Sequence, residues 1–305
     1  MTRYALLLAV TALAFAQKRI ATTIDDLPYV DLSERPNLSR AQAATRSILD
    51  ALTKAKAPAA AFVNESKLQV RGERDARVAL LEQWLDAGHV LGNHTFSHPD
   101  FNKVTLDEYT ADIVKGEVLT RDLMRARGHE RFYFRHPFTH TGPDLAKREG
   151  LARFLDSHGY TVAPFTVEHA DYLFNQVREK LLSRGDTAQA ERVRKAYVAH
   201  LDTMLDYFEK LTHASFGRDI AQILIIHASD LNAASLGEML ARTRERGYAF
   251  VTLDDALRDP AYRTEDRYVN KWGPSWLHRW APALGRDMDL RNEPDPPQWV
   301  LDLAK

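Results

Sequence analysis

Cysteine is absent from all 305 residues of this chain. No disulfide can therefore brace the fold, and neither a thiol nucleophile nor a thiolate metal ligand is available. An excess of charge is absent as well, because 41 Lys and Arg stand against 42 Asp and Glu and give a formal net charge of −1. Without a broad basic field, the chain is not expected to bind nucleic acid.

An apolar run of membrane-spanning length is also missing. The run at residues 4–15 has about a dozen residues, whereas a helix needs about 20 to cross a bilayer. It follows Arg3 and ends in Ala14-Phe15-Ala16, which has the small-x-small pattern of a signal-peptidase site. We expect residues 1–16 to be a secretory signal peptide, with an uncleaved anchor as the alternative. The mature chain would then have no membrane span and would be exported, to the periplasm or the extracellular space.

The composition is that of a globular protein, with 45% hydrophobic and 27% charged residues over all 305 residues. Short apolar runs alternate with longer segments of helical periodicity. The predicted strands cover residues 20–25, 59–64, 89–93, 131–135, 160–166, 222–227 and 248–252. The predicted helices cover residues 39–55, 73–87, 106–126, 143–157 and 235–246. About seven βα units in one chain favour an α/β fold of parallel strands, a distorted or incomplete (β/α)7 barrel.

Residues 17–305 are expected to form this barrel as a single domain, with two additions. A helical insertion at about 171–218, before the sixth strand, has apolar residues about four apart and a break at Gly185-Asp186. It is either structural padding on the barrel rim or a wall of a substrate cleft. A C-terminal tail at about 268–305 carries tryptophans four apart, at Trp272, Trp276 and Trp280. Their spacing predicts one helical stripe that closes the bottom of the barrel, and a sugar-stacking platform is the alternative.

Two histidines four residues apart, His94 and His98, follow the third predicted strand. Neutral imidazoles at this spacing can supply half of a tetrahedral metal site, so a further ligand must come from elsewhere. Asp25 and Asp26 end the first predicted strand. Such acidic pairs often cap a helix or close a turn, but at a strand end one carboxylate can bind a cation while its neighbour acts as a base.

Two other strand ends carry residues of similar chemistry. Arg135 leaves an apolar strand just before Pro137, and His227 ends the most hydrophobic strand. A buried salt bridge for Arg135 and a hydrogen-bonded core histidine for His227 are the structural alternatives. A histidine opposite an Asp base could instead protonate a leaving amine, because its ordinary pKa is near neutrality.

These residues together resemble the motifs of the polysaccharide deacetylases of carbohydrate esterase family 4, which have the NodB-type deacetylase domain. The likeness extends over nearly the whole mature chain. Four motifs of that family occur in its order, and the fourth family motif, which lies between the last two of these, is matched with changes. The matching segments are Thr23-Ile24-Asp25-Asp26, His94-Thr95-Phe96-Ser97-His98, Arg135-His136-Pro137-Phe138, Glu168-His169-Ala170-Asp171-Tyr172 and Ile225-Ile226-His227.

The resemblance implies a role for each matched position. Asp26, His94 and His98 would hold one divalent metal ion, zinc in the first place, with cobalt or nickel as alternatives. Asp25 would be the catalytic base, His227 the acid and Asp171 the residue that orients it. Arg135 would orient the base, and the Phe138 backbone N–H would help to hold the oxyanion. The remaining implied residues would contact substrate; they are Ile225, Pro137 and Tyr172.

The activity implied is metal-dependent removal of acetyl groups from N-acetylated sugars of a polysaccharide or oligosaccharide. The expected partner is accordingly an acetylated glycan. The same site would serve an O-acetyl carbohydrate esterase, and a catalytically silent carbohydrate-binding protein is the alternative from another class. The chain departs from the family in the fourth motif, where Glu168 replaces an Asp and Tyr172 a Trp, and in the long insertion that follows Asp171.

Overall fold

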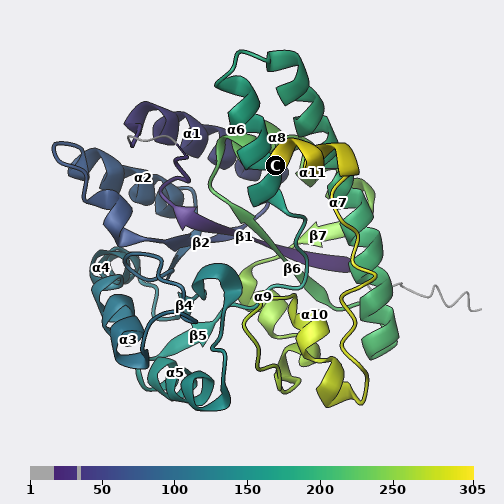
Figure 1. The fold of residues 1–305 in the computed structure, drawn as a ribbon. Coiled ribbons are helices and arrows are strands. Elements are labelled where there is room, and N and C mark those ends of the chain that lie inside the picture. The colour runs from purple at the N-terminus through teal and green to yellow at the C-terminus, as the bar shows by residue number, and fades with distance from the viewer. Residues whose placement is uncertain (1–16, 33–35) are drawn as a thin grey trace, which may run out of the picture.

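Seven parallel strands form one sheet at the centre of the molecule, with helices packed around it (Figure 1). The computed structural model describes residues 17–32 and 36–305. The predicted signal peptide at residues 1–16 therefore lies outside the described residues. The strands are β1 (Lys18–Leu27), β2 (Ala59–Val63), β3 (Val90–Asn93), β4 (Phe132–Phe134), β5 (Tyr160–Val162), β6 (Ala221–His227) and β7 (Tyr248–Phe250).

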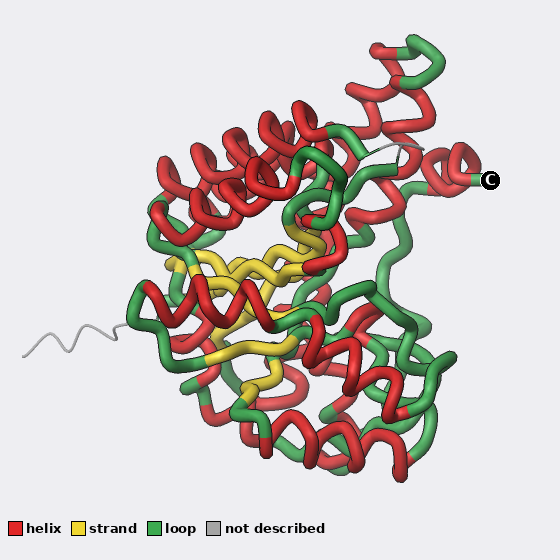
Figure 2. Tube along the Cα trace, turned by 90° about the vertical axis from the view of Figure 1, so that its left-hand side faces the viewer, coloured by secondary structure: helices red, strands yellow, loops and turns green. Residues whose placement is uncertain are grey.

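The helices alternate with these strands, as the periodicity predicts, and lie on both sides of the sheet (Figure 2). They are α1 (Leu38–Ala55), α2 (Arg74–Asp86), α3 (Leu106–Lys115), α4 (Val118–Ala126), α5 (Leu145–Ser157), α6 (Asp171–Leu182), α7 (Thr187–Phe216), α8 (Asp230–Glu245), α9 (Leu253–Leu257), α10 (Trp276–Arg279) and α11 (Gln298–Ala304). Four short 3-10 helices complete the described chain: η1 (Glu65–Leu68), η2 (Pro137–Thr139), η3 (Pro260–Arg263) and η4 (Ala281–Leu284). No helix of residues 17–32 and 36–305 combines the length and apolar character needed to cross a membrane.

The predicted α/β barrel is confirmed, and it is distorted between β5 and β6. The strand order is β5-β4-β3-β2-β1-β6, and β7 pairs with the first residues of β1. Closure between β5 and β6 is irregular, because only a single bridge, Val167 to Leu224, joins the segment after β5 to β6. The predicted strand at 160–166 was therefore too long: the regular strand ends at Val162, where the chain leaves β4 and crosses to β6.

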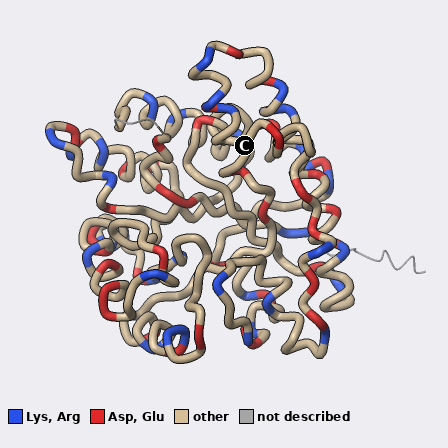
Figure 3. Tube along the Cα trace, in the orientation of Figure 1, with Lys and Arg blue, Asp and Glu red and all other residues tan. Residues whose placement is uncertain are grey.

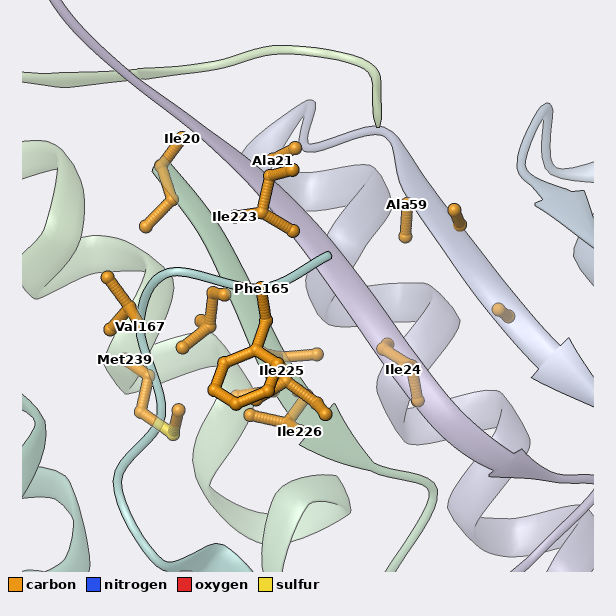
Figure 4. Packing of buried hydrophobic residues seen from close by; sticks show 14 of the residues in the cluster. Ile20, Ala21, Ile24, Ala59, Phe165, Val167, Ile223, Ile225, Ile226 and Met239 are labelled. Atoms are coloured by element: carbon orange, nitrogen blue, oxygen red, sulfur yellow. The ribbon is translucent and has the colours of Figure 1, made fainter. Parts of the chain in front are cut away.

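The core lies on both faces of the two longest strands. Consecutive residues of β1 and β6 are buried, as expected for parallel strands covered on both sides, and β6 is largely apolar. Figure 4 shows Ile225 and Ile226 of β6 beside Phe165 and Val167 of the crossing segment. The core thus continues up to the carboxyl end of β6, where polar residues begin.

Two predicted elements differ from the structure. The single helix expected at 106–126 is two helices, α3 and α4, which are separated at Gly116 and Glu117. The prediction that Trp272, Trp276 and Trp280 form one helical stripe is wrong. Trp276 lies in α10 and Trp280 directly after it, and both are buried, but Trp272 lies in a loop with 61% of its surface exposed. The tail then follows α7 and ends in α11, beside α6 (Figure 1).

Candidate active site

Asp25 and Asp26 lie at the carboxyl end of β1, and an irregularity of the strand brings both to one cavity. Neighbours on a regular strand point to opposite faces. Here the pairing of β1 with β2 shifts register between Ile24 and Leu27, and Asp26 has a φ of 73°. This local distortion allows both carboxylates to line the same cavity.

The two carboxylates have different surroundings. Asp25 is 1% exposed, and its Oδ1 has no hydrogen-bond partner. Burial raises the pKa of Asp25 to about 6, although the positive charge of Arg135 opposes the shift. Burial would also raise the pKa of Asp26, but the ammonium of Lys67, 2.9 Å from its Oδ1, and the nearby histidines hold that pKa below its usual range. At neutral pH both carboxyl groups are therefore ionised. The pKa of Asp25 is much closer to neutral pH than that of Asp26, so Asp25 is protonated much more readily.

His94 and His98 leave the end of β3 and turn back toward Asp26. One ligand atom from each of these three residues lies within 4.8 Å of the others. The His94 Nδ1–H donates to the Arg135 carbonyl at 2.8 Å, which leaves Nε2 free as a ligand. Burial lowers the pKa of both imidazoles, that of His94 most strongly, so both are neutral and able to bind a metal.

The loop that carries the histidines is fastened to α3. The Phe96 N–H donates to the Asp112 carbonyl at 3.1 Å, and Ser97 binds the Asp112 carboxylate through its N–H and hydroxyl. Gly116, at the end of α3, lies against this loop so closely that a Cβ there would be 2.4 Å from the Phe96 nitrogen. The break between α3 and α4 thus makes room for the histidine loop.

Arg135 extends from the end of β4 into the core beneath Asp25. Its side chain is fully buried over the ring of Phe62, with Nη2 donating to Thr23 Oγ1 at 2.7 Å and Nε 3.9 Å from Asp25 Oδ1. After it the chain turns sharply. Pro137 is buried and is not among the described residues that line the cavity, whereas Phe138 lines it with its ring edge-on to His98.

His227 and Asp171 form a close pair at the end of β6, where His227 is the register partner of Asp25 on the neighbouring strand. Asp171 Oδ1 lies 2.8 Å from His227 Nδ1, and Asp171 Oδ2 accepts the His227 backbone N–H at 2.7 Å. Burial lowers the pKa of His227, but the attraction of Asp171 outweighs it and raises that pKa to about 10. Asn232 donates to Asp171 at 2.8 Å, and its own side-chain oxygen accepts from Tyr197 of α7. The insertion therefore reaches the site through Tyr197.

The cavity joins these groups in one space of about 470 Å³. Asp25, Asp26, His94, His98 and His227 line its floor, and the predicted substrate contacts Ile225 and Tyr172 line it too. Tyr172 is 64% exposed, as a contact for an incoming ligand must be before binding. Of the residues predicted to act at the site, Arg135 and Pro137 lie behind the lining rather than in it.

The donor set fits a divalent cation of the zinc type. Two neutral imidazoles and one ionised carboxylate leave room for water or substrate, which is the open arrangement of a catalytic zinc site. Asp26, His94 and His98 are the only such group of three found in the described part of the chain. Lys67 is the one misfit, because its ammonium lies beside the Asp26 oxygen that faces His98.

The loops of the site are held in unusual backbone conformations. Seven non-glycine residues among those described have positive φ, and six of them lie in or beside the matched segments: Asp26, Thr95, His98, Phe138, Thr139 and Ala170. Such conformations cost of order 1 kcal/mol or more each and persist where the surroundings impose them. Their concentration around one cavity is typical of a functional site.

Sequence reasoning missed three residues that support this geometry: Lys67, Asn232 and Tyr197. Each is brought to the site by tertiary packing from a separate helix, η1, α8 or α7. Tyr197 was identified only as part of an apolar helical face. No short-range pattern marks a hydrogen-bonding partner of a catalytic pair.

The fold and the site define an α/β barrel in which three potential metal ligands converge beside the buried Asp25 carboxylate and the His227–Asp171 pair. A family model described as polysaccharide deacetylase matches residues 13–154. A peptidoglycan-N-acetylglucosamine deacetylase of Bacillus cereus is 30% identical over 158 residues, which cover 52% of this chain and 48% of that protein. A peptidoglycan-N-acetylmuramic acid deacetylase of Bacillus subtilis is 21% identical over 220 residues, covering 72% and 68%.

Solved structures agree on the fold. A mutant of a CE4 family pseudoenzyme with restored enzymatic activity has a TM-score of 0.54 at 16% identity, covering 79% of this chain and 68% of that one. A peptidoglycan N-acetylglucosamine deacetylase in complex with a hydroxamate compound has a TM-score of 0.51 at 19% identity, covering 79% and 89%. The family model thus assigns residues 13–154, nearly half of the chain, to the polysaccharide deacetylases, and solved CE4 structures share the fold of the chain. The chain spans about half the length of the Bacillus cereus relative.

Proposed function

We propose that this protein is a metal-dependent hydrolase that removes acetyl groups from the N-acetylated sugars of a polysaccharide or oligosaccharide. The observation that carries the proposal is the position of Asp25. Its carboxylate is buried without a hydrogen bond to Oδ1, beside three convergent ligand atoms. Its register partner on the neighbouring strand is His227, a histidine that is protonated at neutral pH. A binding protein would have no need of such a costly free carboxylate.

Each residue then has a defined task. Asp26, His94 and His98 would hold the cation, which supplies Lewis-acid polarisation of the acetyl carbonyl and acidifies a water molecule. Asp25 accepts the proton of the attacking water. Arg135, whose Nε lies 3.9 Å from Asp25 Oδ1, orients that carboxylate. The Phe138 N–H is assigned to the developing oxyanion. Ile225 provides an apolar surface for the acetyl methyl group.

The leaving nitrogen must receive a proton before the C–N bond can break. His227 is suited to donate it, because Asp171 binds Nδ1 and leaves Nε2 to act toward the cavity. The raised pKa of His227 means that this proton is present at neutral pH. Asp171 is the positioning residue, since it contacts His227 rather than substrate.

The test is hydrolysis of N-acetylated chitooligosaccharides by purified protein, beginning at residue 17, after thorough chelation and after return of zinc, cobalt or nickel. Chelated protein should release no acetate, and metal should restore release. The His94→Ala variant should not recover, whereas the control His158→Ala, at an exposed histidine after α5, should behave as wild type. Full activity without metal would contradict metal dependence, and O-acetylated substrates in parallel would separate an esterase from an N-deacetylase.

A further inference from the structure

One wall of the cavity comes from segments beyond the stretch that the family model matches, which ends at residue 154. Glu168, Tyr172 and Asn175 come from the start of the insertion, and Gly273–Ser275 and Glu293 come from the tail. Thr139 Oγ1 donates to the Gly273 carbonyl at 2.6 Å, and Ser275 Oγ donates to the Thr166 carbonyl at 2.8 Å. The tail is thus fixed as part of the cavity.

Two carboxyl groups of this wall, Glu168 and Glu293, face each other. They share a side-chain hydrogen bond, Glu168 also accepts the Ala170 N–H at 3.0 Å, and Glu293 lies 3.0 Å from His278 Nε2. Burial, together with the negative charge of Glu293, raises the pKa of Glu168 to about 8. At neutral pH Glu168 therefore keeps a proton and can donate a hydrogen bond.

The charge of the cavity is one-sided. Its lining includes five carboxyl residues, Asp25, Asp26, Glu168, Asp171 and Glu293, and, over the described chain, no Lys or Arg. The three on the floor have cationic neighbours behind or beside them, namely Arg135, Lys67 and His227. The wall pair has no Lys or Arg partner within salt-bridge distance among the described residues. A sugar carboxylate is usually bound by Arg or Lys, so nothing seen in this wall would receive one.

We propose that Glu168 and Glu293 are specificity-determining residues that select a glycan without a carboxylate on the acetylated sugar or its neighbour. This inference rests on the proposed deacetylase function. The favoured substrate class is an uncharged N-acetylhexosamine chain, and sugars that carry an acidic ether, such as N-acetylmuramic acid, are rejected. A cavity of about 470 Å³ holds the reacting sugar and little more, so such a carboxylate would lie within a Debye length, about 8–10 Å, of the wall.

The mechanism of selection has two parts. The Glu293 carboxylate repels a substrate anion in the cavity, because the protein walls screen charges less than bulk water does. The protonated Glu168 and the Glu293 oxygens offer hydrogen bonds that sugar hydroxyls and acetamido groups can satisfy. A neutral sugar therefore forms hydrogen bonds with Glu168 and Glu293, whereas the carboxylate of an acidic sugar is repelled by Glu293.

The experiment compares two forms of one substrate, a disaccharide of N-acetylglucosamine and N-acetylmuramic acid with the lactyl group either as free acid or as methyl ester. The zinc-loaded wild-type protein should deacetylate the ester at least about fivefold more efficiently, in kcat/KM, than the acid. Glu293→Gln should reduce this ratio, because it removes the charge that repels the acid. Glu168→Gln replaces a protonated carboxyl by a neutral amide and should change the ratio much less. The control Glu265→Gln removes an exposed tail carboxylate outside the cavity and should leave the ratio unchanged.

Each result decides between the two proposals. Equal efficiencies for acid and ester in wild-type protein would overturn the selectivity and leave the deacetylase function standing. If no substrate is deacetylated, including N-acetylated chitooligosaccharides, the proposed function fails, and calorimetric binding of acid and ester then decides the selectivity. Equal dissociation constants would overturn it, and tighter binding of the ester would support it. Because the wild-type comparison needs no variant, misfolding of a Gln variant cannot obscure the answer.

Discussion

Asp171 binds His227 at two points, the ring Nδ1 at 2.8 Å and the backbone N–H at 2.7 Å. The double contact fixes both the position and the charge of the imidazole. In metal-free protein the pKa of His227 is about 10, above the ordinary value of about 6.5. A raised pKa means that the pair stabilises the fold fully below pH about 6.5, and that this contribution is lost as the pH rises through about 10.

Asp171→Asn should therefore bring the pKa of His227 below its ordinary value, because burial remains while the counter-charge is gone. Histidine NMR titration of the metal-free protein measures this directly. The control is Asp219→Asn, which removes the carboxylate beside the exposed His213 and should leave His227 unchanged. A wild-type titration of His227 in the Asp171→Asn variant would contradict the assigned role.

Asp25→Asn should abolish deacetylation and also stabilise the metal-free fold. Burial raises the pKa of Asp25 from 3.8 to about 6, so its ionised form is disfavoured in the folded state. The destabilisation develops between pH about 4 and 6 and persists above, where it amounts to about 3 kcal/mol at most. Denaturant unfolding at pH 7 and pH 4 should show a stabilised variant at pH 7 and a smaller difference at pH 4. A variant less stable than wild type at pH 7 would contradict this account.

Lys67→Met should strengthen zinc binding. The Lys67 ammonium lies 2.9 Å from Asp26 Oδ1, so a cation arriving at that carboxylate meets a positive charge already in place. Its removal should lower the zinc dissociation constant roughly tenfold. Calorimetric titration of metal-free protein tests this, with Lys54→Met on the exposed side of α1 as the control. Unchanged or weaker binding would show instead that Lys67 holds Asp26 in its ligating position.

Gly116→Ala should damage the metal site through shape alone. The backbone at Gly116 has φ −88°, which alanine adopts without strain, but its Cβ would meet the Phe96 nitrogen at 2.4 Å. We expect a loss of about 1–3 kcal/mol in unfolding free energy and weaker zinc binding, because the loop of His94 and His98 must shift.

Gly237→Ala is the matched control, in the middle of α8 with only the Ala51 Cβ nearby, at 3.9 Å. It should stabilise the fold by about 0.5–1 kcal/mol and leave zinc binding unchanged. Thermal unfolding and calorimetry on both variants give the comparison. Equal zinc affinity in Gly116→Ala and wild type would show that the loop tolerates the displacement.

Much of the strand map was predictable because five of the seven strands are short apolar runs that follow a helix-ending glycine. Gly88 and Gly247, for example, have positive φ just before β3 and β7. The crossing of the chain after Val162 was not predictable, since residues 163–167 are as apolar as a strand and only their partner, β6, decides the geometry. The break at Gly116 likewise depends on a loop twenty residues away.

The residues proposed to bind the metal and to act as acid and base share the end of the barrel at which the strand map placed them. The supports behind them could not be read in the same way. Tyr197 is spaced like any core residue of an amphipathic helix, and its hydroxyl gains a meaning only when Asn232 lies opposite. Glu293 stands in a tail without strong periodicity, and only the packing of that tail along the cavity brings it to Glu168. Figure 3 shows why overall charge offers no guide, because acidic and basic residues are interspersed along the chain.

Strand β1 pairs with β2, β6 and β7, whereas β4 and β5 are three residues long each and lie toward the far end of the sheet. Asp25 and Asp26 thus belong to the strand that pairs with three others, whereas Arg135 follows β4, which has only three residues. Amides of β1 should exchange with deuterium slowest of all, and those around β4 and β5 much faster. Mild denaturant should consequently abolish the proposed activity while most of the circular dichroism persists, because Asp25, the proposed base, would stay in place after Arg135, proposed to orient it, is released.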